Sequence, residues 1–328
     1  MVTRIEADLA ALRFVLMAKK LFEYRPFIEY AGEITEESGK RQYTSKCGLS
    51  CASTTTVLSQ YEDLTNDKGE DILEVWGNKM RKLGQDPDLI SQESARVGTA
   101  AHALIESYLI DGVYPLGSLV EQKLACTAID NFYSHVDPEY AQVEQPLFFH
   151  GNIQKNPENF MLAGRYDNLV KIPDNTFKTV KTGEIISEKF VICDLKTKRS
   201  YEKLKKGGVK LKSLGRSDNV DFMFKNCLQA SFYAAALTLG TDFKERYGAG
   251  ITGAVLVYVN EERSKLAYLS HSDLNYYWRI FKDILRDFYG IKPLERNWKQ
   301  MISDANWRPD YVNGGYTSNI PKEIESIK

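Results

Sequence analysis

Asp194 and Lys196 are the residues whose types and spacing first indicate chemistry. They stand two apart at the end of the apolar run 190–193. On a strand, side chains two residues apart point to the same face. A carboxylate beside an ammonium at a strand end can hold a divalent metal ion and orient a water molecule. Asp242 and Lys244 have the same spacing but follow no apolar run, so the spacing alone is weak evidence.

Three further motifs accompany this pair in a fixed order along the chain. They are Gly98-x3-His102-x3-Glu106 and Gly164-x-x-Asp167 before it, and Gln229-x3-Tyr233 after it. Carboxylate, carbonyl and water oxygens are the ligands that Mg²⁺ and Mn²⁺ prefer. If their strands are neighbours, Asp167 and Asp194 are suitable ligands, and Lys196 would orient the attacking water and stabilise charge on a phosphate. By itself, Asp167 is equally typical of a turn and Lys196 of a strand at a sheet edge.

The other motif residues fall on two expected helices. His102 and Glu106 stand at i and i+4 and share a helix face, as do Gln229 and Tyr233. His102 would bind a metal ion or contact the scissile phosphate, although a histidine on an apolar helix face is more often a core residue. Glu106 would take part in catalysis or only orient cationic neighbours. Gln229 and Tyr233 would bond a phosphate, a water molecule or Lys196, or else would simply lie on a core helix.

The four motifs in this order resemble the RecB-like branch of the PD-(D/E)xK nuclease superfamily. The Ser/Thr-rich segment 52–58 is similar to a segment of the mitochondrial genome maintenance exonucleases and their phage relatives. The motifs cover residues 91–260, and the two ends of the chain are poorly covered. This resemblance implies an α/β fold of mixed α+β type, a restriction-endonuclease-like core in which helices flank a central mixed sheet.

The resemblance also assigns roles to single residues. It places His102 in the metal site and the backbone carbonyl of Leu195 on the metal ion. RecB-like relatives often carry a glutamate near the site in the first core strand, where Glu144 stands, so Glu144 is a secondary candidate. Some relatives hold an iron–sulfur cluster through one N-terminal and three C-terminal cysteines. Because no cysteine follows Cys227, we expect no cluster here.

A basic stretch follows the Asp194 strand directly. Residues 196–216 contain nine Lys or Arg and one Glu, although the net charge of the chain is −1. We interpret the stretch as a loop that tracks phosphates beside the metal site; the alternative is a solvated loop. Ser53 and Thr54 would bind phosphate at a helix N-terminus or act as an ordinary N-cap. The predicted DNA contacts are Ser53, Thr54, Lys198, Arg199, Lys203, Lys205, Lys206, Lys210 and Lys212.

Composition bounds the class of protein. The chain has 328 residues, of which 43% are hydrophobic and 27% charged, as is ordinary for a globular protein. We expect neither a transmembrane helix nor a signal peptide, because there is no apolar run of 18 residues and no basic leader. Five cysteines, an odd number in a long chain, favour a reducing compartment. We expect a cytoplasmic protein, in the host cytoplasm if it is viral.

Periodicity predicts the elements that position the motifs. Helices are expected at 5–21, 53–60, 68–82, 91–110, 117–134, 220–239 and 272–290. Strands are expected at 143–149, 161–172, 189–197, 252–259 and 265–270. Residues 32–45 are expected to form a loop or hairpin, and the polar insertion 173–188 a hairpin loop. We predict a mostly helical region over 1–90 that walls a DNA channel, a nuclease core over 91–295 and an extension over 296–328.

The sequence therefore predicts a Mg²⁺- or Mn²⁺-dependent deoxyribonuclease with one or two ions. It would act as an exonuclease on free ends of single-stranded DNA, in replication, recombination or repair, with a possible protein partner from those pathways. The first alternative is a structure-dependent flap or junction endonuclease. The second is a non-catalytic DNA-binding assembly subunit, which would have no physical need for a metal triad.

Overall fold

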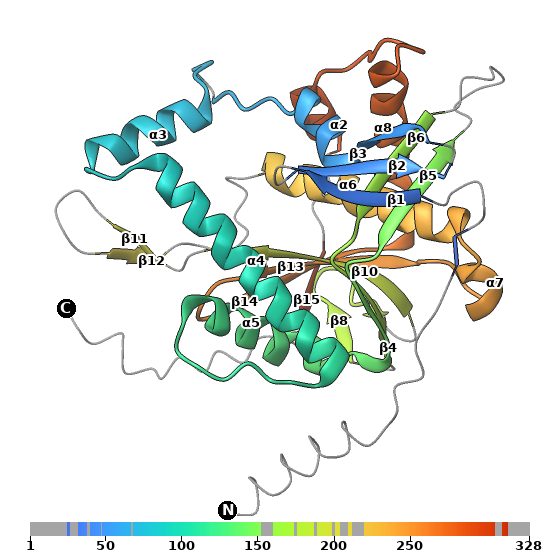
Figure 1. Cartoon of the computed structure of the whole chain (residues 1–328), viewed down its shortest axis with the longest axis horizontal. Coiled ribbons are helices and arrows are strands. Elements are labelled where there is room, and N and C mark those ends of the chain that lie inside the picture. Colours follow the sequence, from blue (N-terminus) through green and yellow to red (C-terminus); the bar gives the residue numbers. More distant parts are fainter. Residues whose placement is uncertain are drawn as a thin grey trace, which may run out of the picture.

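The computed structural model shows a mixed α/β fold with eight α-helices and two mixed β-sheets in its described residues (Figure 1). The described residues are 25–26, 32–37, 40–46, 48–66, 68–151, 160–173, 176–186, 189–198, 201–203, 209–211, 220–305 and 310–313. The mixed class predicted from the sequence is confirmed. None of the helices in these ranges is long and apolar enough to cross a membrane.

The larger sheet has eight strands in the order β4-β7-β10-β13-β14-β15-β8-β9. Their bounds are β4 (Asp137–Val143), β7 (Asn168–Ile172), β8 (Phe177–Thr179), β9 (Ile185–Ile186), β10 (Lys189–Thr197), β13 (Gly253–Val259), β14 (Ser264–Leu269) and β15 (Asp310–Asn313). β10 pairs antiparallel with β7 and parallel with β13. Its bounds match the predicted strand 189–197, which carries Asp194 and Lys196.

Buried side chains of β10 alternate between two hydrophobic clusters. Phe190 and Ile192 belong to one cluster, whereas Val191, Cys193 and Leu195 belong to the cluster on the opposite face. This is the period of two that a strand buried on both faces requires. Asp194 therefore shares the face of Ile192.

The smaller sheet has five strands in the order β1-β2-β3-β6-β5. They are β1 (Gly32–Glu37), β2 (Lys40–Ser45), β3 (Ser50–Ser53), β5 (Pro146–Gly151) and β6 (Phe160–Arg165). The predicted single strands 143–149 and 161–172 are wrong in this respect. Each is two strands in different sheets, because the chain turns at residues 144–145 and again at 166–167. The two turns lie side by side, since the backbone N–H of Glu144 donates to the carbonyl of Asp167 at 2.8 Å.

Helices cover both faces of the larger sheet. They are α2 (Thr54–Tyr61), α3 (Ile72–Lys82), α4 (Pro87–Asp111), α5 (Val120–Asn131), α6 (Val220–Gly240), α7 (Phe243–Tyr247), α8 (His271–Phe288) and α9 (Trp298–Asp304), with a 3₁₀ turn at Tyr133–His135. α4 and α5 lie on one face, and α6 lies between the two sheets with α8 against it (Figure 1). α3 and the first half of α4 extend away from the sheets.

α4 carries the His102–Glu106 motif, and its ends are set by local chemistry. The Asp86 carboxylate accepts the backbone N–H of Asp88 at 2.9 Å, Pro87 starts the helix, and Gly112 ends it with a φ of 71°. Gly98 lets α4 approach β10, because a Cβ there would lie 3.3 Å from Thr197 Oγ1.

The predicted helices agree with α2, α3, α4, α5, α6 and α8, and the hairpins expected at 32–45 and 173–188 are β1–β2 and β8–β9. The expected helix at 5–21 lies outside the described residues. The description of 1–90 as mostly helical needs a correction, because Gly32–Ser53 forms three strands. The division into regions stays a prediction, although residue 90 lies inside α4 and β15, from the expected extension, joins the larger sheet.

Asp310 fastens β15 to the β8–β9 hairpin. Its Oδ1 accepts the N–H of Lys181 at 2.8 Å, and its Oδ2 accepts the N–H of Thr182 at 2.9 Å. Burial alone would raise the pKa of Asp310, but these hydrogen bonds outweigh it and lower the pKa. A carboxyl whose pKa is lowered on folding stabilises the fold at neutral pH and loses that effect as the pH falls through the lowered pKa.

We therefore expect Asp310→Ala to lower the free energy of unfolding at pH 7 by about 1 kcal/mol, the lower end for bonds to a half-exposed charge. Urea unfolding checks this, and the difference from the wild type should shrink in acid. Asp304→Ala is the matched control, because Asp304 has 52% of its side chain exposed and pairs with Arg296 at 3.2 Å. An equal loss in both variants would contradict the role of Asp310.

Candidate active site

Asp194 lies at the centre of the candidate site, near the end of β10. It is 3% exposed, and Lys196 Nζ lies 2.9 Å from its Oδ1 and 2.8 Å from its Oδ2. The prediction that the two side chains share a face is confirmed by this contact. Burial raises the pKa of Asp194 above its ordinary value; the charge of Lys196 opposes that shift, and the charge of Asp167 adds to it.

Lys196 keeps its charge in this environment. Its side chain is 21% exposed. Burial works against the ammonium, but the carboxylates of Asp194 and Asp167 outweigh it, so the pKa of Lys196 lies above its ordinary value. Lys196 can therefore donate hydrogen bonds and stabilise negative charge at neutral pH, whereas it is unsuited to accept a proton.

Asp167 reaches the same place from the turn between β6 and β7. Its Oδ2 accepts the backbone N–H of Leu195 at 2.8 Å, which places the carboxylate beside Asp194. Asp167 is thus a turn residue, as one interpretation of the sequence held, and it also faces the site. The backbone N–H and carbonyl of one strand residue point to the same edge of the strand, so the Leu195 carbonyl also faces the Asp167 side. Its place on a metal ion, which the family resemblance implies, stays a prediction.

His102 and Glu106 approach from α4. His102 Nδ1 lies 3.8 Å from Asp167 Oδ2, with 25% of the histidine side chain exposed. Glu106 lies one turn further on; burial and the charge of Glu144 raise its pKa, while Arg165 and His102 oppose the shift. His102 is therefore a half-buried neighbour of the carboxylates rather than a core histidine.

Gln229 and Tyr233 come from α6, on the Asp194 side of the larger sheet. Gln229 Nε2 donates to Tyr233 Oη at 2.8 Å, and Tyr233 is 3% exposed. Burial raises the pKa of Tyr233 well above its ordinary value, and the charges of Asp194 and Asp167 contribute. The two side chains bond each other, as their i, i+4 spacing allows, and Tyr233 stays protonated.

Ser53 and Thr54 do not behave alike. Ser53 is the N-cap of α2 and its Oγ accepts the N–H of Thr56 at 3.0 Å, as the ordinary capping interpretation held. Thr54 is 1% exposed and its hydroxyl donates to the Ala163 carbonyl at 3.2 Å. The predicted DNA contact by Thr54 is therefore wrong, because its hydroxyl is buried and already bonded.

The basic stretch is only partly described. Its Lys198 Nζ lies 5.7 Å from the centre of the Tyr258 ring. Lys203 and Lys210 lie in a hairpin of β11 (Tyr201–Lys203) and β12 (Val209–Leu211), where a loop was expected. Figure 1 shows this hairpin outside the two sheets, on the side of α3. The other predicted contacts, Arg199, Lys205, Lys206 and Lys212, lie outside the described residues.

Glu144 and Arg165 form an ion pair that the sequence did not reveal. Arg165 Nη2 lies 2.8 Å from Glu144 Oε2. Glu144 does not lie in a strand, as was expected; it occupies the turn between β4 and β5 with a φ of 46°. Arg165 belongs to the Gly164-x-x-Asp167 motif, and that position was the only available signal for it.

The donor set suits a hard divalent ion in part. Within the described part of the chain, no group of three or more His, Cys, Asp or Glu side chains is placed to hold a metal ion. Two carboxylates do meet, however, and Asp194 Oδ2 is buried without an aligned hydrogen bond from any described residue. Mg²⁺ usually takes one or two carboxylates and keeps several waters, so Asp167, Asp194 and the Leu195 carbonyl fit such an ion.

Sulfur ligands are a separate question. Cys51, Cys126, Cys193 and Cys227 are free thiols. Cys47 lies outside the described residues. The expectation that the protein holds no iron–sulfur cluster stays a prediction, to be checked by iron and acid-labile sulfide analysis.

Comparisons with known proteins add little. No family model and no curated protein sequence matches the chain. Sixteen chains of solved structures match it. One of them, described as the crystal structure of SSO0001, is 11% identical over 88% of this chain and 87% of that chain, with a TM-score of 0.32. The function must therefore be argued from the residues of this chain.

Gly164 packs directly against Tyr233. A Cβ at Gly164 would lie 2.6 Å from Tyr233 Cε1 and 3.0 Å from Thr54 Oγ1. We expect Gly164→Ala to cost about 1–3 kcal/mol through overpacking, measured by urea unfolding. Gly77→Ala in α3 is the matched control, because its Cβ would meet other atoms no closer than 3.5 Å. Gly77→Ala should be neutral or stabilise the protein by up to about 1 kcal/mol. Changes in the free energy of unfolding of the same sign in both variants would refute the close packing at Gly164.

Proposed function

We propose that the protein is a Mg²⁺- or Mn²⁺-dependent deoxyribonuclease of the PD-(D/E)xK superfamily, similar to the RecB-like exonucleases. The observation that carries the proposal is the meeting of Asp167, Asp194 and Lys196 at the end of β10. Asp194 is buried beside a second carboxylate. This arrangement costs stability and is typical of functional sites. A divalent cation is the partner that such a pair is built to bind.

The order of elements supports the superfamily. α4, β4, β7, β10, α6 and β13 occur in this order as a helix, three strands, a helix and a strand, with α5, α7 and six further strands between them in the described part of the chain. The family resemblance leads to the same succession. In it, the helix motifs lie on α4 and α6, and the carboxylates lie on β10 and on the turn into β7.

The residues would divide the work of phosphodiester hydrolysis. A bound Mg²⁺ or Mn²⁺ ion would supply a positioned water molecule and neutralise charge on the phosphate. Asp167 and Asp194 would hold that ion, and the protonated Lys196 would donate to the water or to a phosphate oxygen. Tyr233, protonated and bonded to Gln229, would pack against Gly164 and fix the wall of the site. His102 would contact the ion or the phosphate beside Asp167.

Action from free ends of single-stranded DNA is the mode that we propose. The basic stretch 196–216 begins at the last residues of β10, and α3 with the first half of α4 extends from the body on the side of the β11–β12 hairpin (Figure 1). We propose that these elements wall a channel over the site, and a strand threaded through a channel must enter by an end. Partners in replication, recombination or repair would follow from that substrate.

Digestion of end-labelled DNA tests this proposal. Purified protein with Mn²⁺ should shorten a linear single strand to small oligonucleotides, act weakly on blunt duplex and leave a covalently closed single-stranded circle intact. EDTA should stop the reaction. Efficient cutting of the circle would replace the exonuclease with the endonuclease alternative. DNA binding without any hydrolysis in Mg²⁺ or Mn²⁺ would favour the non-catalytic subunit.

A further inference from the structure

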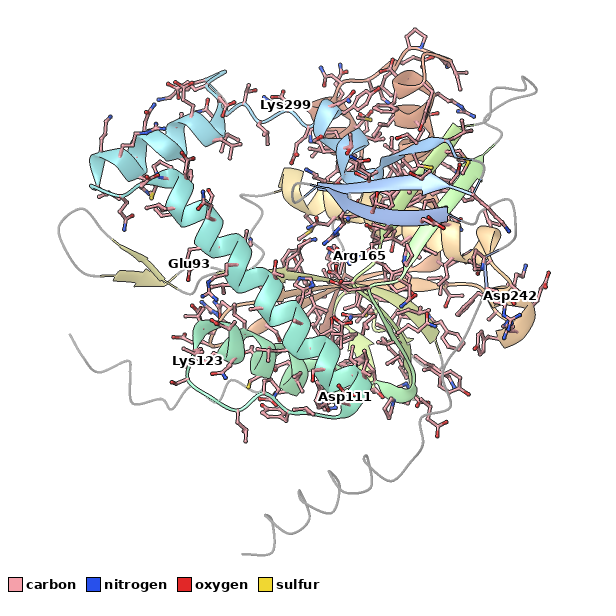
Figure 2. All side chains as sticks on the ribbon, in the orientation of Figure 1. Glu93, Asp111, Lys123, Arg165, Asp242 and Lys299 are labelled. Carbon is pink, nitrogen blue, oxygen red and sulfur yellow. The ribbon has the colours of Figure 1, made fainter. Side chains whose placement is uncertain are left out.

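Arg165 is a cation at the candidate site with no part in the hydrolysis proposed above. It is the last residue of β6, two residues before Asp167, and it pairs in register with Pro146, the first residue of β5. It therefore lies where the chain crosses between the two sheets. Figure 2 labels Arg165 at this junction, below α6 and near β10 in this view.

The guanidinium of Arg165 is only partly used. Its one recorded ion pair among the described residues is Nη2 to Glu144 Oε2 at 2.8 Å, and 24% of its side chain is exposed. A guanidinium carries five N–H donors in a planar fork. Arg96 offers a comparison, because its Nε and Nη2 both bond Glu93, at 2.8 and 3.0 Å. Arg165 thus keeps donors for a further planar or tetrahedral oxyanion.

Glu144 is held over Arg165 by an unusual backbone. It is the single non-glycine residue with a positive φ in the described ranges, at 46°. Such a conformation costs on the order of 1 kcal/mol for most residues, and it persists where the surroundings enforce it. Here the Glu144 N–H donates to the Asp167 carbonyl at 2.8 Å. The turn that presents the Glu144 carboxylate is therefore tied to the residue that faces Asp194.

The site is rich in negative charge. Asp167, Asp194, Glu106 and Glu144 all interact electrostatically within it. A phosphodiester strand, which is also an anion, needs compensating cations there. Lys196 is paired with both oxygens of Asp194, whereas the permanently charged guanidinium of Arg165 meets Glu144 through one nitrogen and has donors to spare.

We propose that Arg165 binds a phosphate of the substrate strand next to the scissile one, and that Glu144 occupies Arg165 until the strand arrives. The inference rests on the proposed function for the identity of the strand. The binding of a phosphate oxyanion by Arg165 can be tested without any cleavage. Glu144 is then a competitor for Arg165, and the two residues affect binding in opposite directions.

Fluorescence anisotropy with a labelled 15-nucleotide oligo-dT in EDTA tests the inference. Arg165→Ala should weaken binding by about tenfold or more, the effect of losing a charged hydrogen bond, and lower the salt slope by about one. Arg165→Lys should recover part of the lost affinity. Glu144→Gln, which keeps the shape, should tighten binding about three- to fivefold by removing a like charge near the phosphate. Arg246→Ala, which breaks the surface pair with Asp242, is the control and should change nothing.

The outcomes separate this inference from the proposed function. If Arg165→Ala and Glu144→Gln shift binding in the same direction, or if neither shifts it, the ion pair only supports the fold and the inference is overturned. If Arg165 governs binding but the wild type cleaves nothing with Mn²⁺, the nuclease proposal fails and the phosphate site stands. Near-ultraviolet circular dichroism of each variant ensures that only folded protein is compared.

Discussion

Asp194→Asn should abolish DNA cleavage, lowering turnover by about a thousandfold or more. The change keeps the shape of the side chain but removes the charge that binds a divalent ion. Losing one positioned electrostatic group at a reaction centre already costs roughly 10²- to 10³-fold. Two effects on stability oppose each other: the amide removes a carboxylate whose pKa burial raises, and it leaves Lys196 without its ion-pair partner.

The measurements for this prediction are the initial rate on labelled single-stranded DNA and the midpoint of thermal unfolding. Asp242→Asn is the matched control, since Asp242, the N-cap of α7, and Lys244 repeat the Asp-x-Lys spacing where α7 packs on Phe190, at the opposite end of β10 from Asp194. It should keep full activity. Wild-type turnover in Asp194→Asn, with both metals supplied, would show that the catalytic site does not lie at the end of β10.

Lys196→Ala should reduce cleavage by about 10²- to 10³-fold while leaving the affinity for Mn²⁺ largely unchanged. Lys196 contributes a positive charge and hydrogen-bond donors, neither of which binds a cation. Its removal also leaves the buried Asp194 without its ion-pair partner, so the stability of the metal-free protein should fall. Added Mn²⁺ should restore part of that stability by binding the folded state.

Single-turnover kinetics with saturating Mn²⁺ would measure the loss, and Lys196→Arg would test geometry, because a planar guanidinium keeps the charge but not the position. We expect Lys196→Arg to stay at least tenfold below the wild type. Complete loss of Mn²⁺ binding in Lys196→Ala would contradict the proposed role of Lys196, since it would make the lysine necessary for the ion itself.

The sequence predicted local elements well because their signals are local. The apolar run of β10 is buried on both faces, and the capped, periodic segment around His102 became α4 with bounds close to those expected. Spacing at i and i+4 placed Gln229 and Tyr233 in contact. These features depend on periods of 2.0 and 3.6 residues, which can be read from a single segment.

What the sequence did not reveal depends on distant segments. The two strands predicted at 143–149 and 161–172 each change sheets at a polar pair of residues, and nothing local distinguishes such a crossing from an ordinary strand. The pairing of Glu144 with Arg165 follows from that crossing, so it was invisible as well. Thr54 has a hydroxyl near a helix N-terminus, as a phosphate-binding residue would, but its burial against Ala163 depends on β3 and β6 being neighbours.

Binding of Mn²⁺ to the metal-free protein, followed by the loss of the free-ion electron paramagnetic resonance signal, tests the central claim most directly. No third side chain completes the site among the described residues, so the claim depends on Asp167 and Asp194. We expect one or two bound ions in the wild type and in Asp242→Asn, and a large loss of affinity in both Asp167→Asn and Asp194→Asn. Unchanged binding in Asp167→Asn and Asp194→Asn would show that the ion, and the nuclease chemistry assigned to it, do not belong to this site.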